Sequence, residues 1–230
     1  MTLLRINTIP MALQSDFSRR VQEIAAELGI EPNWLMQVMW SESRLNPQAV
    51  NRQTGDPADP FTRAARRATG LLQFMPATAR SLGTNNQAIF KMNALQQLEL
   101  VRRYFLPWKG RMKSYYDVYS VVFFPALIGK PDTWVLQTSS LPAATIARQN
   151  PAVNINKDGK ITVAEFKQYV FNSVLAAHRS LVFGQIQQAA QTAANTVKNN
   201  PGASGLVAGA VLVFLFFYSL TINSLSNQLL

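Results

Sequence analysis

The sequence predicts a mainly α-helical protein. Apolar residues recur at helical spacing, strand-like alternation is scarce, and turn signals separate the periodic segments. The length of 230 residues is enough to bury a core in one domain with appendages. The expected divisions are an N-terminal extension (1–15), a main helical domain (16–150), a loop and helix (151–180), a stalk or linker (181–203), one transmembrane helix (204–222) and a short tail (223–230).

Cap and proline signals give the expected helices in order. Asp16 and Ser18 are N-cap candidates for a first helix, which Gly29 closes. Pro32 suits the first turn of a second helix. Pro76 begins a short helix that ends at Gly83, and Asn93 caps a helix over 94–105. Ser114 with Asp117 precedes another helix, which Pro125 ends. A last amphipathic helix is expected over 164–183.

Composition restricts the chemistry. The chain has no cysteine, which excludes disulfides and thiol catalysis, and its single histidine, His178, excludes a histidine zinc cluster or a Ser-His-Asp triad. It carries 22 Lys and Arg against 12 Asp and Glu, a formal charge of +10. Such a surplus suits a polyanionic partner, whether nucleic acid, anionic lipid or a cell-wall polymer, or serves solubility alone.

The two termini differ. Residues 1–16 are interrupted by Arg5, Asn7 and Pro10, so they are not expected to be a secretory signal peptide. No charged side chain follows Lys198, and residues 202–222 are uncharged and mostly apolar. About 20 such residues cross ~30 Å of hydrocarbon as a helix, so we expect a membrane anchor at 204–222.

One carboxylate lies among the apolar residues of an expected helix. In the second expected helix, Leu35, Val38 and Met39 precede Glu42 at offsets of seven, four and three residues. Glu42 therefore falls on the apolar stripe of the helix. A carboxyl group there is costly unless it is paired, hydrogen-bonded or kept protonated, which suggests a chemical role.

A second informative stretch is ATGLLQFMPATA, residues 68–79. Gly70 permits a tight turn, and Pro76 keeps Met75 out of helical geometry. Gln73 is therefore expected in a bent segment, where its amide can offer a donor and an acceptor to a polar ligand.

Taken together, ESRLNPQAV (42–50) and residues 68–79 resemble the lytic transglycosylase family, which has a goose-type lysozyme-like fold and cleaves the glycan strand of peptidoglycan. The resemblance covers residues 16–125 and extends less clearly to 180. It implies that Glu42 is the catalytic acid and base, that Ser43 contacts substrate, that Gln73 binds the saccharide, and that Phe74 and Met75 line the glycan cleft. It also implies an intramolecular attack by the muramic 6-hydroxyl, which leaves a 1,6-anhydro end.

The chain departs from the family pattern in two places. It lacks the usual Tyr-Asn-Ala-Gly segment and has YYDVYSVVFFPALIGKP instead, which looks like a phage-type variant. Tyr119 is then the candidate for a hydroxyl near Glu42, ahead of Tyr115 and Tyr116. The interval between the motifs is also long and contains Asp56 and Asp59. A second carboxylate there would position water and convert the reaction to hydrolysis, although Asp-Pro pairs more often form turns.

A third motif follows the catalytic region. Residues 154–165, NINKDGKITVAE, fit a 12-residue calcium loop resembling an EF-hand. The ligands would be Asn154, Asn156, Asp158, the Lys160 carbonyl and Glu165. Only two of them carry charge, which predicts weak Ca²⁺ binding or a metal-free turn of the same shape.

The resulting hypothesis is a membrane-anchored lytic transglycosylase that cleaves the MurNAc-GlcNAc β-1,4 bond of peptidoglycan without a catalytic cofactor. Without a signal peptide such an enzyme needs another route to the cell wall, so we expect a virion membrane or phage particle, other virion proteins as partners, and no nucleic acid. The alternatives are a lysozyme-type hydrolase and a non-catalytic glycan-binding ejection protein.

Overall fold

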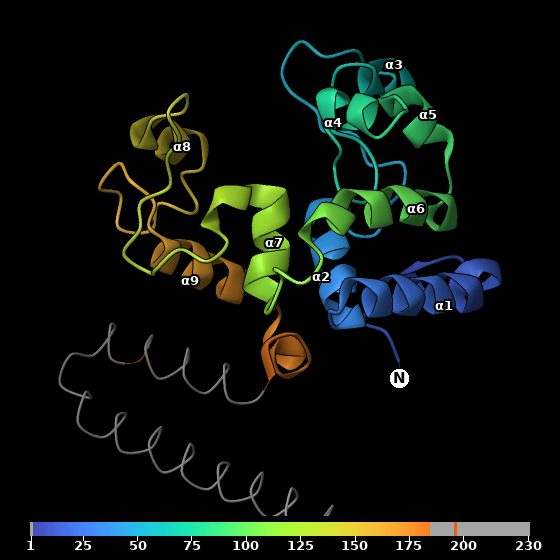
Figure 1. The fold of residues 1–230 in the computed structure, drawn as a ribbon. Helices are drawn as coiled ribbons and strands as arrows, with labels where there is room; N and C mark the ends of the chain where they lie inside the picture. Colours follow the sequence, from blue (N-terminus) through green and yellow to red (C-terminus); the bar gives the residue numbers. More distant parts are fainter. Residues whose placement is uncertain (1, 185–195, 197–230) are drawn as a thin grey trace, which may run out of the picture. The chain divides into compact units, whose positions relative to one another are not determined.

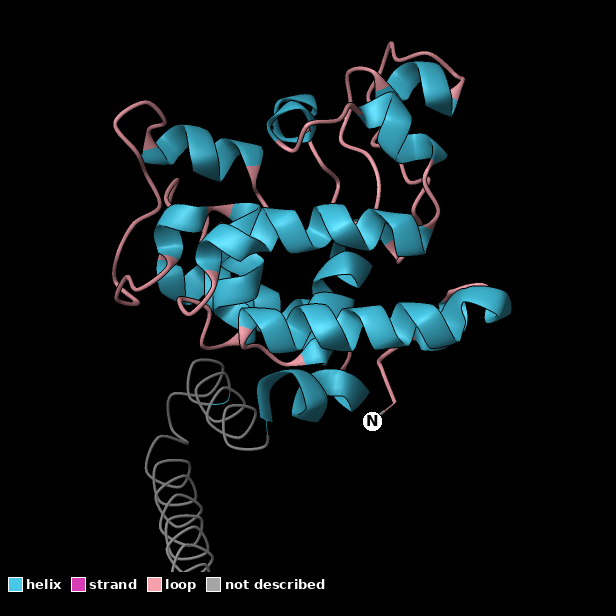
Figure 2. Cartoon of the chain, turned by 45° about the vertical axis from the view of Figure 1, so that its right-hand side comes forward, coloured by secondary structure: helices cyan, strands magenta, loops and turns pink. Residues whose placement is uncertain are grey.

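The computed structural model describes residues 2–184 and residue 196. In this part of the chain the protein is helical, with loops and three isolated β-bridges in place of strands, so the mainly α prediction is confirmed (Figures 1 and 2). The elements are η1 (Ile6–Thr8), α1 (Met11–Leu28), α2 (Pro32–Ser43), α3 (Pro60–Ala64), α4 (Pro76–Ser81), α5 (Asn86–Lys91), α6 (Ala94–Phe105), η2 (Leu106–Trp108), α7 (Tyr115–Phe123), η3 (Pro125–Leu127), α8 (Ala143–Gln149), α9 (Val163–Ser173) and η4 (Ala176–His178).

The chain divides into two compact units, Met1–Ser173 and Val174–Leu230. In the first unit α1 packs against α2 and α6, α2 also contacts α7, and α7 contacts α9 (Figure 1). Their facing side chains form the core, which includes the fully buried Phe17, Leu35, Phe105, Tyr115 and Phe166. The second helix is thus covered by its neighbours on more than one side.

The first helix begins earlier than predicted. It starts at Met11, after Pro10, and runs through Asp16 and Ser18 without a cap at either residue. The side-chain amide of Gln14 donates to the Ile9 carbonyl at 2.9 Å. Leu3, Leu4 and Ile9 are buried, so the first residues belong to the core of this unit.

The other cap signals agree with the structure. Gly29, with φ 70°, ends α1, and its amide donates to the carbonyls of Ala25 and Ala26. Asn93 forms a capping box with Gln96 at the start of α6. Ser114 caps α7, which ends at Phe123 before Pro125, as predicted.

The helix expected over 164–183 is interrupted. α9 ends at Ser173, and the 3-10 turn η4 follows within the second unit. Leu175, predicted to face inward, is 58% exposed. The apolar spacing that suggested one long helix therefore spans α9, η4 and a further helical stretch that begins at Arg179.

Most of the predicted stalk and the whole predicted transmembrane helix at 204–222 lie outside the described residues. Within the described part of the chain, no helix is both long enough and apolar enough to cross a bilayer.

Candidate active site

Glu42 lies one residue before the end of α2, in the position that the apolar stripe predicted. Leu35, Val38 and Met39 on the same stripe are fully buried, and Glu42 is half-buried. The helix ends at Ser43, and the C-cap residue Arg44, with a φ of 58°, turns the chain away from the helix axis. The carboxyl group thus sits at the rim of the core, where one side of it remains accessible.

Burial dominates the electrostatics of this carboxyl group. It raises the pKa of Glu42 to about 7, because removal from water disfavours the charged form. A hydrogen bond from the Tyr119 hydroxyl acts in the opposite direction and lowers the pKa. Near neutral pH Glu42 therefore exists in both protonation states, as a group that must donate and later accept a proton requires.

Tyr119 is held in place by aromatic packing. It lies on α7 and stacks on Phe123 and Phe166, with ring centroids 6.5 and 6.0 Å apart. Its own pKa is raised by burial and by the nearby Glu42 charge, so it stays protonated and acts as a donor. The hydroxyl expected near Glu42 is thus that of Tyr119, which hydrogen-bonds the carboxyl group.

Tyr115, also on α7, interacts with the buried part of α2. It is 1% exposed, burial raises the pKa of its hydroxyl, and the nearby Ser41 and Gln37 side chains act in the opposite direction. The Gln37 side chain accepts a hydrogen bond from Arg5 at 3.0 Å. The Arg5 guanidinium lies 4.0 Å from the ring of Trp40. A buried polar network therefore fixes the turn of α2 that carries Glu42, and part of it comes from the first residues of the chain.

Ser43 joins the two sequence motifs. Its hydroxyl oxygen lies 3.0 Å from the Met39 carbonyl and 3.0 Å from the Leu71 carbonyl. The residue is 7% exposed. The structure gives Ser43 a link between α2 and the turn at 70–73, and its side chain is not directed to solvent as a substrate contact would require.

That turn is closed by a buried glutamine that the sequence analysis missed. Gln97 on α6 accepts from the Leu71 amide at 2.8 Å and donates to the Pro47 carbonyl at 2.7 Å and the Ile89 carbonyl at 3.0 Å. Gly70 has φ +84°, and a Cβ atom there would collide with the Gln97 side chain. The sequence signal that could have identified Gln97 is the presence of a glutamine on the otherwise apolar face of this helix.

Gln73, the last residue of this turn, and the two residues after it have different surroundings. Gln73 has φ 49°, and its amide donates to the Ala49 and Gly70 carbonyls at 3.1 and 3.0 Å. Phe74 is 2% exposed and meets Tyr104 edge-on at 5.7 Å, so it supports the core and does not line an open cleft. Met75 is 55% exposed.

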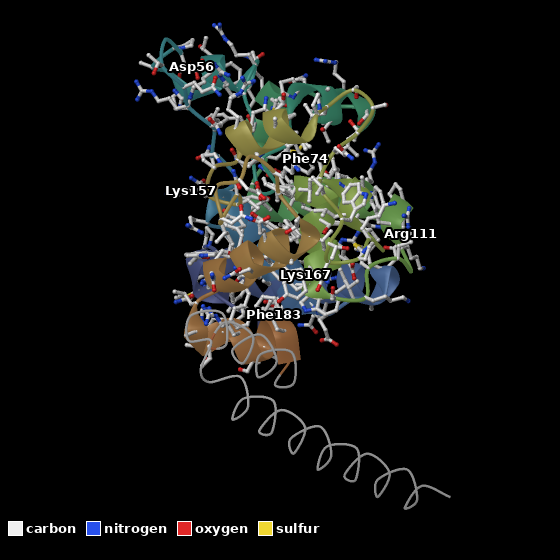
Figure 3. All side chains as sticks on the ribbon, turned by 90° about the vertical axis from the view of Figure 1, so that its left-hand side faces the viewer. Asp56, Phe74, Arg111, Lys157, Lys167 and Phe183 are labelled. Carbon is white, nitrogen blue, oxygen red and sulfur yellow. The ribbon has the colours of Figure 1, made fainter. Side chains whose placement is uncertain are left out.

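The two aspartates of the intervening loop have structural partners. Asp56 forms a two-point ion pair with Arg67, with a shortest distance of 2.8 Å, and its pKa is lowered by that guanidinium. Asp59 caps α3 by accepting from the Thr62 amide at 2.7 Å. Asp56 lies at the top of Figure 3, beyond Phe74 as seen from Lys167 on α9. Both aspartates are therefore engaged in structural contacts with Arg67 and Thr62.

A cavity of about 260 Å³ opens beside Glu42. Seven further residues line it, from the end of α7 and from the segment 141–150: Val122, Phe123, Phe124, Leu141, Ile146, Gln149 and Asn150. The sequence analysis did not identify any of these seven. A concave site with apolar walls, a few polar groups and one carboxyl of raised pKa has the features of a catalytic pocket.

The loop 154–165 is compact and tied to α9. Glu165 is 6% exposed and accepts from the amides of Asn156 and Thr162 at 3.2 and 2.9 Å. Gly159 turns the chain with φ +80°. Asn154 Oδ1 is buried without a hydrogen-bond partner among the described residues. In that part of the chain no cluster of three or more acidic, histidine or cysteine side chains is present.

Fold and site together have the features of a helical, glycosidase-like enzyme: a helical domain and a cavity beside one carboxyl group of raised pKa. Residues 19–99 match the family model described as the transglycosylase SLT domain. This match includes Glu42 and the 68–79 stretch and covers less than half of the chain. No curated protein and no solved structure matches the chain. The matched region indicates a lytic transglycosylase activity, that of a lysozyme-like enzyme that cleaves peptidoglycan.

Proposed function

We propose that the protein cleaves the β-1,4 bond between MurNAc and GlcNAc of peptidoglycan with formation of a 1,6-anhydro end, and that Glu42 is its acid and base. The observation that carries this proposal is the half-buried Glu42, whose pKa is raised to about 7, at the wall of a cavity. A protonated carboxyl group can deliver its proton to the glycosidic oxygen as the C1–O bond breaks.

The second half of the reaction uses the same side chain. After proton transfer Glu42 is a carboxylate, and it accepts the proton of the muramic 6-hydroxyl as that oxygen bonds to C1. The bond broken and the bond formed are both C–O bonds, and no water is consumed. The Tyr119 hydroxyl stabilises the carboxylate that exists between the two halves of the reaction, because its hydrogen bond favours the charged form of Glu42.

The hydrolase alternative requires a second carboxylate to activate water or act as nucleophile. Asp56 is occupied by Arg67 and Asp59 caps α3, so neither supports that alternative. Among the residues that line the cavity, Glu42 is the one acidic group.

The test is digestion of purified peptidoglycan by the full chain, with the released muropeptides weighed by mass spectrometry. Anhydro ends from the wild type and no cleavage by Glu42→Gln are the expected result. Reducing ends would overturn the transglycosylase chemistry. Binding without any cleavage would favour a non-catalytic glycan-binding protein.

We further propose a membrane-anchored protein of a virion membrane or phage particle that opens the cell wall locally. Its support is the uncharged, apolar stretch over 202–222. The expected result is that the full chain floats with liposomes in a density gradient and stays there after an alkaline wash. Recovery in the soluble fractions would contradict the anchor, and absence from purified particles would contradict the virion role.

A structural Ca²⁺ in the loop 154–165 is a separate proposal. The buried Asn154 oxygen that lacks a partner fits a cation ligand, and Asn156, Asp158, the Lys160 carbonyl and Glu165 would supply the other oxygens. Two carboxylates correspond to a weak site. The ion would stabilise the loop ahead of α9 and would take no part in the bond cleavage.

A further inference from the structure

Apart from Glu42, the residues that line the cavity lie outside the matched family region. One wall, formed by Leu141, Ile146, Gln149 and Asn150, comes from the segment that contains α8, well beyond residue 99. Ile146 and Ala147 are buried and anchor this helix in the first unit. The amides of Val153 and Asn154 bond the Asn150 carbonyl at 3.0 and 3.3 Å, which fixes its end.

The polar groups of this wall are two carboxamides. Gln149 is exposed, and the described residues provide no hydrogen bond to its side chain. The Asn150 amide group donates to the Ile146 carbonyl at 2.9 Å, which leaves its Oδ1 as an acceptor. The wall therefore offers one full carboxamide, with donor and acceptor, and one additional acceptor.

The remaining surface is apolar, and it carries no positive charge. Phe123 and Phe124 on one side and Leu141 and Ile146 on the other enclose the space. Because no Lys or Arg lines the cavity, it does not suit the carboxylates of a peptide stem. A neutral group with one N–H, one C=O and a methyl matches it, and the acetamido group of an N-acetylated sugar has this composition.

We propose that the α8 wall recognises the acetamido group of a sugar next to the scissile bond, with Gln149 as the principal binding residue. The Gln149 carboxamide pairs with the acetamide N–H and C=O, and the acetyl methyl packs on Leu141 and Ile146. This inference rests on the proposed glycan cleavage and adds the group that the site selects.

The experiment compares peptidoglycan before and after enzymatic N-deacetylation as substrates for the full chain. Wild type is expected to lose affinity on deacetylation, with KM raised about tenfold, the scale of one lost hydrogen-bonded contact. Gln149→Leu is expected to show the higher KM on both substrates, with kcat and the pH profile unchanged. Gln137→Ala, an exposed glutamine away from the cavity, is the matched control and is expected to behave as wild type.

A Gln149→Leu protein with wild-type KM on both substrates would overturn this inference while leaving the proposed cleavage intact. A second measurement separates binding from catalysis: calorimetric titration of Glu42→Gln with N-acetylglucosamine hexamer. Binding that weakens about tenfold with the added Gln149→Leu change supports the inference even if no cleavage is found. Binding that is indifferent to Gln149 contradicts it.

Discussion

The Tyr119 hydroxyl donates a hydrogen bond to the Glu42 carboxyl group, and it opposes the effect of burial on that group. Burial raises the pKa of Glu42, whereas the hydrogen bond lowers it, and the balance lies at about 7. The two residues come from different helices, α2 and α7, which pack against each other in the first unit. The pKa of this carboxyl group is therefore set by the tertiary fold.

The pH dependence of cleavage follows from this balance. In the proposed mechanism the reaction begins with protonated Glu42, so kcat/KM is expected to fall as the pH rises above about 7. Tyr119→Phe removes the bond that favours the carboxylate and should move this alkaline limb to higher pH. Tyr116→Phe is the matched control, with an unchanged limb. A limb that moves to lower pH in Tyr119→Phe would contradict the assigned role.

Glu42→Gln is expected to reduce turnover by about 10²–10⁴-fold or more, the usual contribution of a general acid. Peptidoglycan digestion at pH 6, where most of the wild-type Glu42 is protonated, measures this loss. A variant that retains full activity would refute the assignment of Glu42.

The same substitution is expected to change stability in a pH-dependent way. Between pH 4.5 and about 7 folded Glu42 keeps a proton that the unfolded chain releases, so the wild type loses stability as pH rises through this window. The loss is on the order of 3 kcal/mol and is complete above pH 7. Glu42→Gln has no ionisable group at this position, so its stability does not fall in this way. Denaturant unfolding should show that the free energy of unfolding of the variant, relative to that of the wild type, increases between pH 4.5 and pH 8. The same difference in free energy at both pH values would contradict a raised pKa of Glu42.

Gly70→Ala is expected to destabilise the protein by about 2–4 kcal/mol. The new Cβ would meet the Gln97 side chain and lie 2.8 Å from Ile89 Cγ2, at a φ of +84°. Gly110→Ala is the matched control, because Gly110 has φ +78° and open space around its Cβ position. The control should cost about 1 kcal/mol from backbone strain alone. Equal losses in denaturant unfolding would show that the Gln97 contact does not matter.

Calcium binding has a thermal signature. If the loop 154–165 holds the ion, Ca²⁺ should raise the melting temperature of the full chain and a chelator should reverse the rise. Asp158→Asn keeps the acceptor for the Lys160 amide, which Asp158 now binds at 2.9 Å, and removes one of two charges. It should abolish most of the rise. Melting that is insensitive to both calcium and chelator would contradict the site.

Sequence reasoning succeeded where the signal is local. Helix caps such as Gly29, Asn93 and Ser114 satisfy backbone groups of their own turn, so they can be read from neighbouring residues. The position of Glu42 on an apolar stripe is also local. The start of α1 was predicted too late, because Pro10 and residues 11–15 carry no side-chain cap.

What the sequence did not reveal depends on distant contacts. Gln97 links Pro47, Leu71 and Ile89, and no spacing rule joins those residues. The α8 wall reaches Glu42 through tertiary packing, so Gln149 could not be assigned from its own segment. The burial of Phe74 and the inward bonds of Gln73 likewise appear only when α6 and the turn at 70–73 are seen together.

The most direct test of the Glu42 mechanism is digestion of peptidoglycan in water enriched in heavy oxygen, followed by mass analysis of the new muramic acid ends. The mechanism without water predicts 1,6-anhydro ends that carry no label from the solvent, and no such ends with Glu42→Gln. Reducing ends that contain one solvent oxygen would show that water completes the reaction and would contradict the account.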